Sequence, residues 1–197
     1  AGEAWIVFGG TDLAALYEPK TDMSMPPSSA ARIIGTDYDD LFGSTTLGAD
    51  VDRDGFDDAL VSAALWRESA GIGGLELGGG DGIDNLRYNS GETFVIYGHS
   101  RLRGSVIDLA ALLVDGAPNS EAISVIYGAD ANDLLGEELA VGDFNGDGVS
   151  EIALGSLIAN GADNTVFEAG EAWIISAHPP FRGQAFDVLS LEPGRGF

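Results

Sequence analysis

One stretch of this chain occurs twice, and the second copy follows the first without a gap at an offset of 93 residues, so that Asp143 corresponds to Asp50. The two copies share apolar residues, glycines and acids. The equivalent pairs include Ile33 and Ile126, Gly35 and Gly128, Asp37 and Asp130, Asp40-Leu41 and Asp133-Leu134, and Gly43 and Gly136. Internal repetition indicates a fold assembled from similar supersecondary units that stack on one another. The chain is therefore predicted to adopt a repeat architecture.

Each copy carries a nine-residue segment with oxygen-bearing side chains at positions 1, 3, 5 and 9 and a glycine at position 6. A hard cation such as Ca²⁺ takes about six to eight oxygen ligands, and alternate residues of a tight turn can supply them. Glycine permits the sharp bend. The predicted side-chain ligands are Asp50, Asp52, Asp54 and Asp58 in the first segment and Asp143, Asn145, Asp147 and Glu151 in the second, with the carbonyls of Phe56 and Val149 at position 7. The sequence thus predicts two calcium sites.

Asp, Asn and Gly also dominate ordinary turns that bind no metal, so one such segment alone would support either interpretation. The repetition of the acids together with their flanks favours calcium. An EF-hand does not fit, because position 12 is Val61 or Leu154 where an EF-hand has a bidentate Glu. The short apolar stretches 59–64 and 152–156 that follow are typical of buried strands. Each ion would therefore hold a turn between two strands.

Three similar phrases rich in aromatic and β-branched residues predict further strands. They span residues 2–9, 91–98 and 170–177, and each begins with Gly-Glu. Each phrase is followed by a connection and another apolar run, at Ala31–Gly35, Ile123–Tyr127 and Phe186–Ser190. Four short strands per unit, repeated radially, are the signature of a β-propeller blade. The predicted fold class is an all-β propeller with four-stranded blades.

The order of these motifs resembles the FG-GAP repeat, which builds the propeller of integrin α-chains. The resemblance covers nearly the whole chain and runs through Leu-Phe-Gly, the acidic segment, an apolar strand and the Gly-Glu phrase. It implies that the ten residues named above bind calcium at a turn between neighbouring strands of a blade. The second copy departs from the pattern at Leu134-Leu135-Gly136 and at Asn145, which keeps an oxygen ligand but lowers the negative charge.

The blade boundaries follow from this alignment. Residues 1–36 are predicted to end one blade, 37–128 to form a full blade, 129–190 to form another, and 191–197 to begin the next. Propellers need about four to eight blades to close, so the chain is expected to cover two to three blades of a larger propeller.

A glycine-rich segment at 67–90 is predicted to be an exposed insertion in the first full blade. It has no phosphate-binding pattern, since no Lys follows its glycines and no Gly-x-Gly-x-x-Gly is present. Asp81 and Asp84 offer an alternative as ligands of a further ion. Long insertions in repeat proteins commonly build partner-facing surfaces, and this is the preferred interpretation.

The net charge of −23, from 9 basic and 32 acidic residues, excludes nucleic acid as a partner. The chain has no cysteine and so no disulfide, and bound metal is therefore expected to stabilise the fold of an exported protein. Sites of this kind are filled where calcium is abundant, which places the protein outside the cell, at the cell surface or in a periplasm. No apolar run approaches the roughly twenty residues of a membrane span, so direct membrane insertion is not expected.

Catalytic motifs are missing from the sequence. No Gly-x-Ser-x-Gly elbow is present, and His99 and His178 occupy equivalent positions after the Gly-Glu phrases, which favours a structural role in loops. Trp5, Trp66 and Trp173 can stack on sugars, but the equivalent positions of Trp5 and Trp173 favour a place in the blade core. The chain is predicted not to be an enzyme.

The predicted function is a calcium-binding extracellular propeller that binds a protein partner in adhesion or scaffolds a surface assembly. Two alternatives stay open. One is a non-catalytic accessory propeller of a secreted hydrolase or lyase, which a catalytic motif elsewhere in a longer gene product would favour. The other is a structural subunit of an extracellular filament or periplasmic complex, in which the open blade edges pair with neighbouring chains.

Overall fold

The computed structural model describes residues 2–10, 28–68, 75–161, 164–177 and 181–191. These residues form strands and three short 3-10 helices, and none of them is α-helical. The strands are β1 (Glu3–Val7), β2 (Ala30–Ile34), β3 (Thr45–Ala49), β4 (Asp58–Glu68), β5 (Leu75–Gly79), β6 (Glu92–Ile96), β7 (Val106–Asp108), β8 (Leu113–Val114), β9 (Ala117–Pro118), β10 (Ile123–Tyr127), β11 (Glu138–Gly142), β12 (Glu151–Ser156), β13 (Glu171–Ser176) and β14 (Ala185–Asp187). The 3-10 helices are η2 (Ile83–Asn85), η3 (Ala110–Leu112) and η5 (Val188–Ser190). The predicted all-β class is confirmed.

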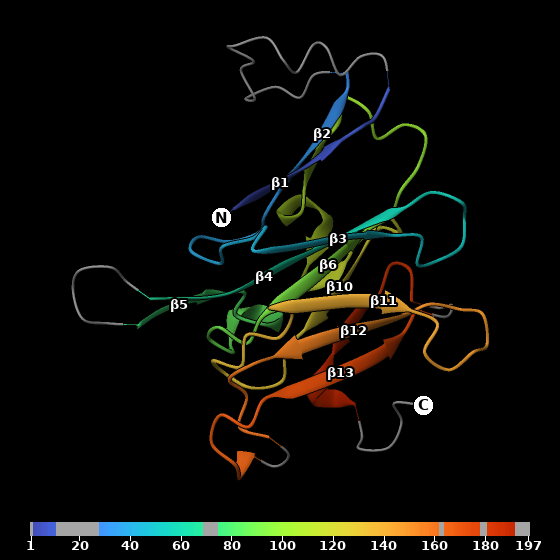
Figure 1. The fold of residues 1–197 in the computed structure, drawn as a ribbon. Coiled ribbons are helices and arrows are strands. Elements are labelled where there is room, and N and C mark those ends of the chain that lie inside the picture. Colours follow the sequence, from blue (N-terminus) through green and yellow to red (C-terminus); the bar gives the residue numbers. More distant parts are fainter. Residues whose placement is uncertain (1, 11–27, 69–74, 162–163, 178–180, 192–197) are drawn as a thin grey trace.

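The strands β3, β4, β6 and β10 form one antiparallel sheet in chain order (Figure 1). Side chains alternate between the two faces of a strand, so the register places Leu47, Leu60 and Val95 on one face. The next register position places Val61 and Phe94 on the other face. Both faces carry apolar residues, which explains why β6 and β10 are buried along their whole length. This sheet is the four-stranded blade that the sequence predicts.

The two neighbouring sheets repeat parts of this blade. The antiparallel sheet of β11, β12 and β13 reproduces the order of β3, β4 and β6. The antiparallel pair of β1 and β2 reproduces β6 and β10. The Gly-Glu phrases thus form strands, as predicted, and the structure places each of them third in the order of its blade.

A short strand from each repeat also crosses to the repeat before it. The strand β7 pairs in parallel with β2, and β14 pairs in parallel with β10, with Ile107 opposite Ile33 and Phe186 opposite Ile126. The prediction of a fourth blade strand at Phe186–Ser190 is therefore wrong. The strand ends at Asp187, whose side chain accepts a hydrogen bond from the amide of Leu189 and begins η5. These crossing strands link successive blades.

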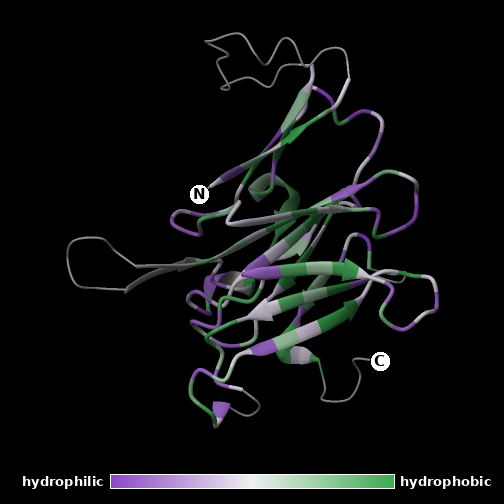
Figure 2. Ribbon diagram, in the orientation of Figure 1, coloured by the Kyte–Doolittle hydropathy of each residue, from purple (hydrophilic) through white to green (hydrophobic). Residues whose placement is uncertain are grey.

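The sheets pack face to face around two apolar cores. The core between the β1–β2 sheet and the central blade includes Phe42 and Phe94, whose rings meet edge to face at 5.8 Å. The core between the central blade and the β11–β13 sheet includes Leu60, Tyr97 and Ile152. Figure 2 shows hydrophobic residues along the strands and hydrophilic residues in the loops at the strand ends. Stacked blades with loops at both ends are the arrangement expected of a partial propeller.

The glycine-rich segment has more regular structure than the exposed loop that was predicted. The strand β5 pairs with the second half of β4 and extends it into a two-stranded ribbon. Gly80 follows, and a Cβ atom at this position would lie 2.2 Å from Cγ of Glu92, so glycine is required for the close packing of that side chain. Residues 69–74 of this segment, His178, and residues 192–197 of the predicted next blade lie outside the described residues.

Candidate metal sites

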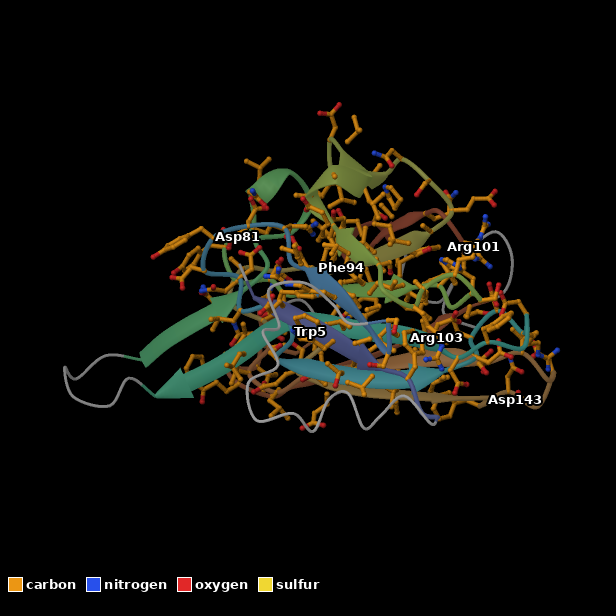
Figure 3. All side chains as sticks on the ribbon, turned by 90° about the horizontal axis from the view of Figure 1, so that it is seen from above. Trp5, Asp81, Phe94, Arg101, Arg103 and Asp143 are labelled. Atoms are coloured by element: carbon orange, nitrogen blue, oxygen red, sulfur yellow. The ribbon has the colours of Figure 1, made fainter. Side chains whose placement is uncertain are left out.

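The two acidic loops connect equivalent antiparallel strands. The first joins β3 to β4 and the second joins β11 to β12. Both lie at the same end of the strands, on the right of Figure 1. Figure 3 shows Asp143 of the second loop at this end and Asp81 at the opposite end. The loops are also neighbours, since a Cβ atom on Gly148 would lie 2.8 Å from Nη2 of Arg53. The predicted turn between two strands is confirmed.

The same four hydrogen bonds shape both loops. The side chain at position 1 accepts from the amide of position 6, position 3 from position 5, position 5 from position 7, and position 9 from position 2. In the first loop the pairs are Asp50–Gly55, Asp52–Asp54, Asp54–Phe56 and Asp58–Val51. In the second they are Asp143–Gly148, Asn145–Asp147, Asp147–Val149 and Glu151–Phe144. These bonds turn the side chains at positions 1, 3, 5 and 9 toward the inside of the loop.

Two positions of each loop have a positive φ angle. Position 6 is a glycine in both loops, with φ of 89° at Gly55 and 83° at Gly148. Position 4 is Gly146 in the second loop, with φ of 78°, but Arg53 in the first, with φ of 65°. A non-glycine residue pays a steric cost there, so the first loop holds its shape against local strain.

The first loop gathers its carboxylates closely enough for one cation. Oxygen atoms of Asp50, Asp52 and Asp58 all lie within 4.8 Å of one another. Oδ1 of Asp50 is buried and has no hydrogen-bond partner among the described residues, which is the condition expected of an atom that faces a ligand. The side chains therefore fit a hard cation such as Ca²⁺.

Asp58 is the most buried acid of this loop, at 1% exposure. Burial raises its pKa to about 6, against the opposing effect of hydrogen bonds from the amides of Gly98 and Val51. Charge repulsion from Asp52 and Asp54 contributes to this raised value. A cation in the loop would favour the ionised carboxylate and offset both effects.

The second loop differs at position 3. Nδ2 of Asn145 donates to Oδ2 of Asp147 at 3.1 Å and to Oε1 of Glu151 at 3.2 Å. This amide brings no charge, so positions 1, 3, 5 and 9 carry three carboxylates in this loop and four in the first. Position 9 is again buried, with Glu151 at 3% exposure. Ligation by these residues, and by the carbonyls of Phe56 and Val149, stays a prediction.

Sequence reasoning missed Arg182, which contacts the first loop. Its Nη1 atom lies 2.5 Å from Oδ2 of Asp52 and 3.7 Å from Oδ2 of Asp54. The contact joins residues about 130 positions apart, and no local pattern in the sequence connects them. The place of Arg182 follows from the stacking of one blade on the next.

A second acidic cluster lies at the opposite end of the central blade. Glu92, at the start of β6, is 3% exposed and borders a cavity of about 380 Å³ that Asp37 and Asp115 also line. The pKa of Glu92 is raised to about 8, first by burial and then by the nearby charges of Asp40, Asp37 and Asp81. The repeated Gly-Glu phrase predicts a strand but gives no sign that only one of its glutamates is deeply buried.

The interpretation of Asp81 and Asp84 as ligands of a third ion gains no support. Oδ1 of Asp81 accepts a hydrogen bond from the amide of Asn89 at 2.8 Å and so stabilises the turn before β6. The side chain of Asp84 lies outside the described residues.

Comparison with known proteins agrees with this structure. The described residues include no helix long and apolar enough to cross a membrane. No curated protein matches the chain. The family model of the FG-GAP repeat matches residues 135–175, which contain β11, the second acidic loop, β12 and nearly all of β13. Residues 135–175 are therefore an FG-GAP repeat, and the central blade is built on the same plan.

Proposed function

We propose that this chain is a calcium-binding propeller module in which two structural ions fix the loops at one end of the blades. The observation that carries this proposal is the pair of loops with identical hydrogen bonds, one of which contains the unpartnered buried Oδ1 atom of Asp50. Turns that only cap strands need no inward-facing, unsatisfied carboxylate. When bound, calcium would neutralise the clustered carboxylates of each loop.

The residues of each loop would hold the ion through side chains that are already oriented. Asp50, Asp52, Asp54 and Asp58 would do so in the first loop, and Asp143, Asn145, Asp147 and Glu151 in the second. Their hydrogen bonds to backbone amides reduce the entropy that is lost on binding. Because each loop joins the first two strands of a blade, a fixed loop also fixes how these two strands pair.

We further propose that the other end of the blades faces a protein partner. Tyr38 is 92% exposed and Tyr88 is 64% exposed in the loops that precede β3 and β6. Phe167, which is equivalent to Tyr88 in the next repeat, is 80% exposed in the loop before β13. Exposed aromatic side chains at equivalent positions of two blades suit the centre of a protein interface.

This module is proposed to act outside the cell, at the cell surface or in a periplasm, and without catalysis of its own. Support comes from the FG-GAP repeat and from loops suited to the calcium concentrations of such compartments. Adhesion and scaffolding both fit a rigid module that presents loops to another protein.

The proposal predicts that Asp54→Ala and Asp147→Ala each remove one calcium site. Each change deletes the carboxylate at position 5, so the affinity of the affected loop should fall by more than about tenfold, since even outer-shell changes commonly cost that much. Calorimetric titration of the metal-stripped variants with Ca²⁺ measures this. Asp108→Ala is the matched control, because Asp108 is an exposed acid of β7 outside both loops. Equal losses in all three variants would contradict specific binding by the loops.

A further inference from the structure

Arg182 follows β13 in the chain but contacts the acidic loop of the preceding blade. Besides its ion pair with Asp52, its Nε atom donates to the carbonyl of Glu121 at 3.0 Å. Its guanidinium carbon lies 4.3 Å from the ring centroid of Tyr97, which is a cation–π contact. One side chain thus connects the predicted ligands at positions 3 and 5 to β10's entry loop and to the end of β6.

The backbone on both sides of Arg182 is fixed by one buried hydroxyl group. Oγ of Ser124 donates to the carbonyl of Phe181 at 2.7 Å and accepts from the amide of Gly183 at 3.1 Å. Phe181 is buried and its ring stacks on Phe186 at 4.5 Å. The guanidinium therefore reaches the loop from a rigid base, and holding it there costs little additional conformational entropy.

The preceding repeat carries a similar arginine. Arg103 lies 79 residues before Arg182, the same offset that relates Gly91 to Gly170. Its guanidinium carbon lies 4.7 Å from the ring centroid of Phe8, and Nη2 donates to the carbonyl of Gly9 at 3.0 Å. A cation–π contact between successive blades is thus a repeated feature, to which Arg182 adds the ion pair with a calcium loop.

The ion pair with Arg182 partly neutralises the acids of the first loop. Oδ1 of Asp52 and Oδ1 of Asp54 accept hydrogen bonds from loop amides, while their Oδ2 atoms face Arg182. The guanidinium therefore supplies positive charge to two of the four acids. A divalent cation that enters the loop must share these carboxylates with Arg182 and is repelled by its charge.

We propose that Arg182 is a positioning residue that holds Asp52 and Asp54 when no ion is bound and thereby lowers the calcium affinity of the first loop. This inference rests on the calcium binding proposed above. Arg182 keeps the loop shaped at low calcium, and ion binding weakens its link between the two blades. Calcium binding in the first loop is thus coupled to the contact between successive repeats.

The test isolates the first loop by the Asp147→Ala change, which disables the second. Calorimetric titration with Ca²⁺ should show that adding Arg182→Gln tightens the remaining site by at least about fivefold, the lower end of usual coupling between sites. Arg182→Lys keeps the positive charge, so its calcium affinity should stay closer to that of the Asp147→Ala parent. Arg103→Gln is the matched control and should leave the affinity unchanged. In the Asp54→Ala background, Arg182→Gln should not alter the second loop.

A second measurement separates positioning from general stabilisation. In EDTA, Arg182→Gln should melt below the wild type, because it loses the ion pair, and saturating Ca²⁺ should reduce or reverse this deficit. An unchanged or weaker affinity, or a deficit equal in EDTA and Ca²⁺, would overturn the proposal. If the first loop binds calcium with an affinity that Arg182→Gln does not change, only the role proposed for Arg182 is contradicted and the proposed function stands. The lack of any binding by the wild type and by Arg182→Gln would overturn the proposed function as well.

Discussion

Removing calcium from the intact chain is expected to lower its melting temperature by about 10–20 °C. A ligand present at 100 times its dissociation constant stabilises the folded state by about 2.7 kcal/mol per site, and two independent sites double this. For a chain of this size, each kcal/mol shifts the melting temperature by roughly 2–4 °C. Thermal melting in EDTA and in excess Ca²⁺, followed by circular dichroism, measures the difference.

The expected shift has a local cause in each loop. Without an ion, Oδ1 of Asp50 stays buried and unsatisfied, and Asp58 stays ionised at a buried position where its pKa is raised to about 6. Both conditions destabilise the turn between β3 and β4.

A double variant tests whether the loops are responsible. Asp50→Ala with Asp143→Ala removes position 1 from both loops and should abolish the calcium-dependent shift, while Mg²⁺ should substitute poorly for Ca²⁺ in the wild type. A wild-type chain that melts at the same temperature with and without calcium would contradict the structural role of the ion.

The parts of the fold that could be predicted from sequence are those encoded locally. The aromatic and β-branched residues of β6 and β10, together with the Gly-Glu phrases, predict strands from neighbouring residues alone. The acidic loops could be recognised because their hydrogen bonds join residues two to seven positions apart, such as Asp54 with Phe56 and Asp58 with Val51. Local spacing therefore determines the loop shape.

The parts that were missed depend on contacts between blades. Residues 185–187 look like a blade strand, but they pair in parallel with β10 of the preceding repeat. Arg182 reaches Asp52 only because that crossing segment lies against the central blade. The close packing of Glu92 depends on the missing side chain at Gly80, which follows the strand β5 that the glycine-rich sequence did not indicate. Such features follow from tertiary packing and leave no periodic signal.

Glu92→Gln is expected to raise stability at neutral pH and to remove most of its pH dependence between about pH 6.5 and 8. The pKa of Glu92 is raised from 4.5 to about 8, first by burial and then by the charges of Asp40, Asp37 and Asp81. The folded state therefore binds a proton that the unfolded state has released. The stability that protonated Glu92 contributes is present at low pH and is lost as the pH rises toward 8. Over this range the free energy of unfolding falls by about 1.4 kcal/mol per pH unit.

Glutamine keeps the shape and the neutrality of the protonated glutamate, so the variant should not lose stability over this range. Asp40 and Asp133 also have pKa values raised to about 6 by burial, but they are ionised above pH 6.5 and contribute mainly at lower pH. Urea denaturation at several pH values in excess Ca²⁺ measures the slope, since calcium bound as proposed would keep the loop acids ionised. Glu171→Gln is the matched control, because Glu171 occupies the equivalent position of β13 but is only partly buried. A slope equal in wild type and Glu92→Gln, or a wild-type stability that rises with pH, would contradict a raised pKa of Glu92 in the folded state.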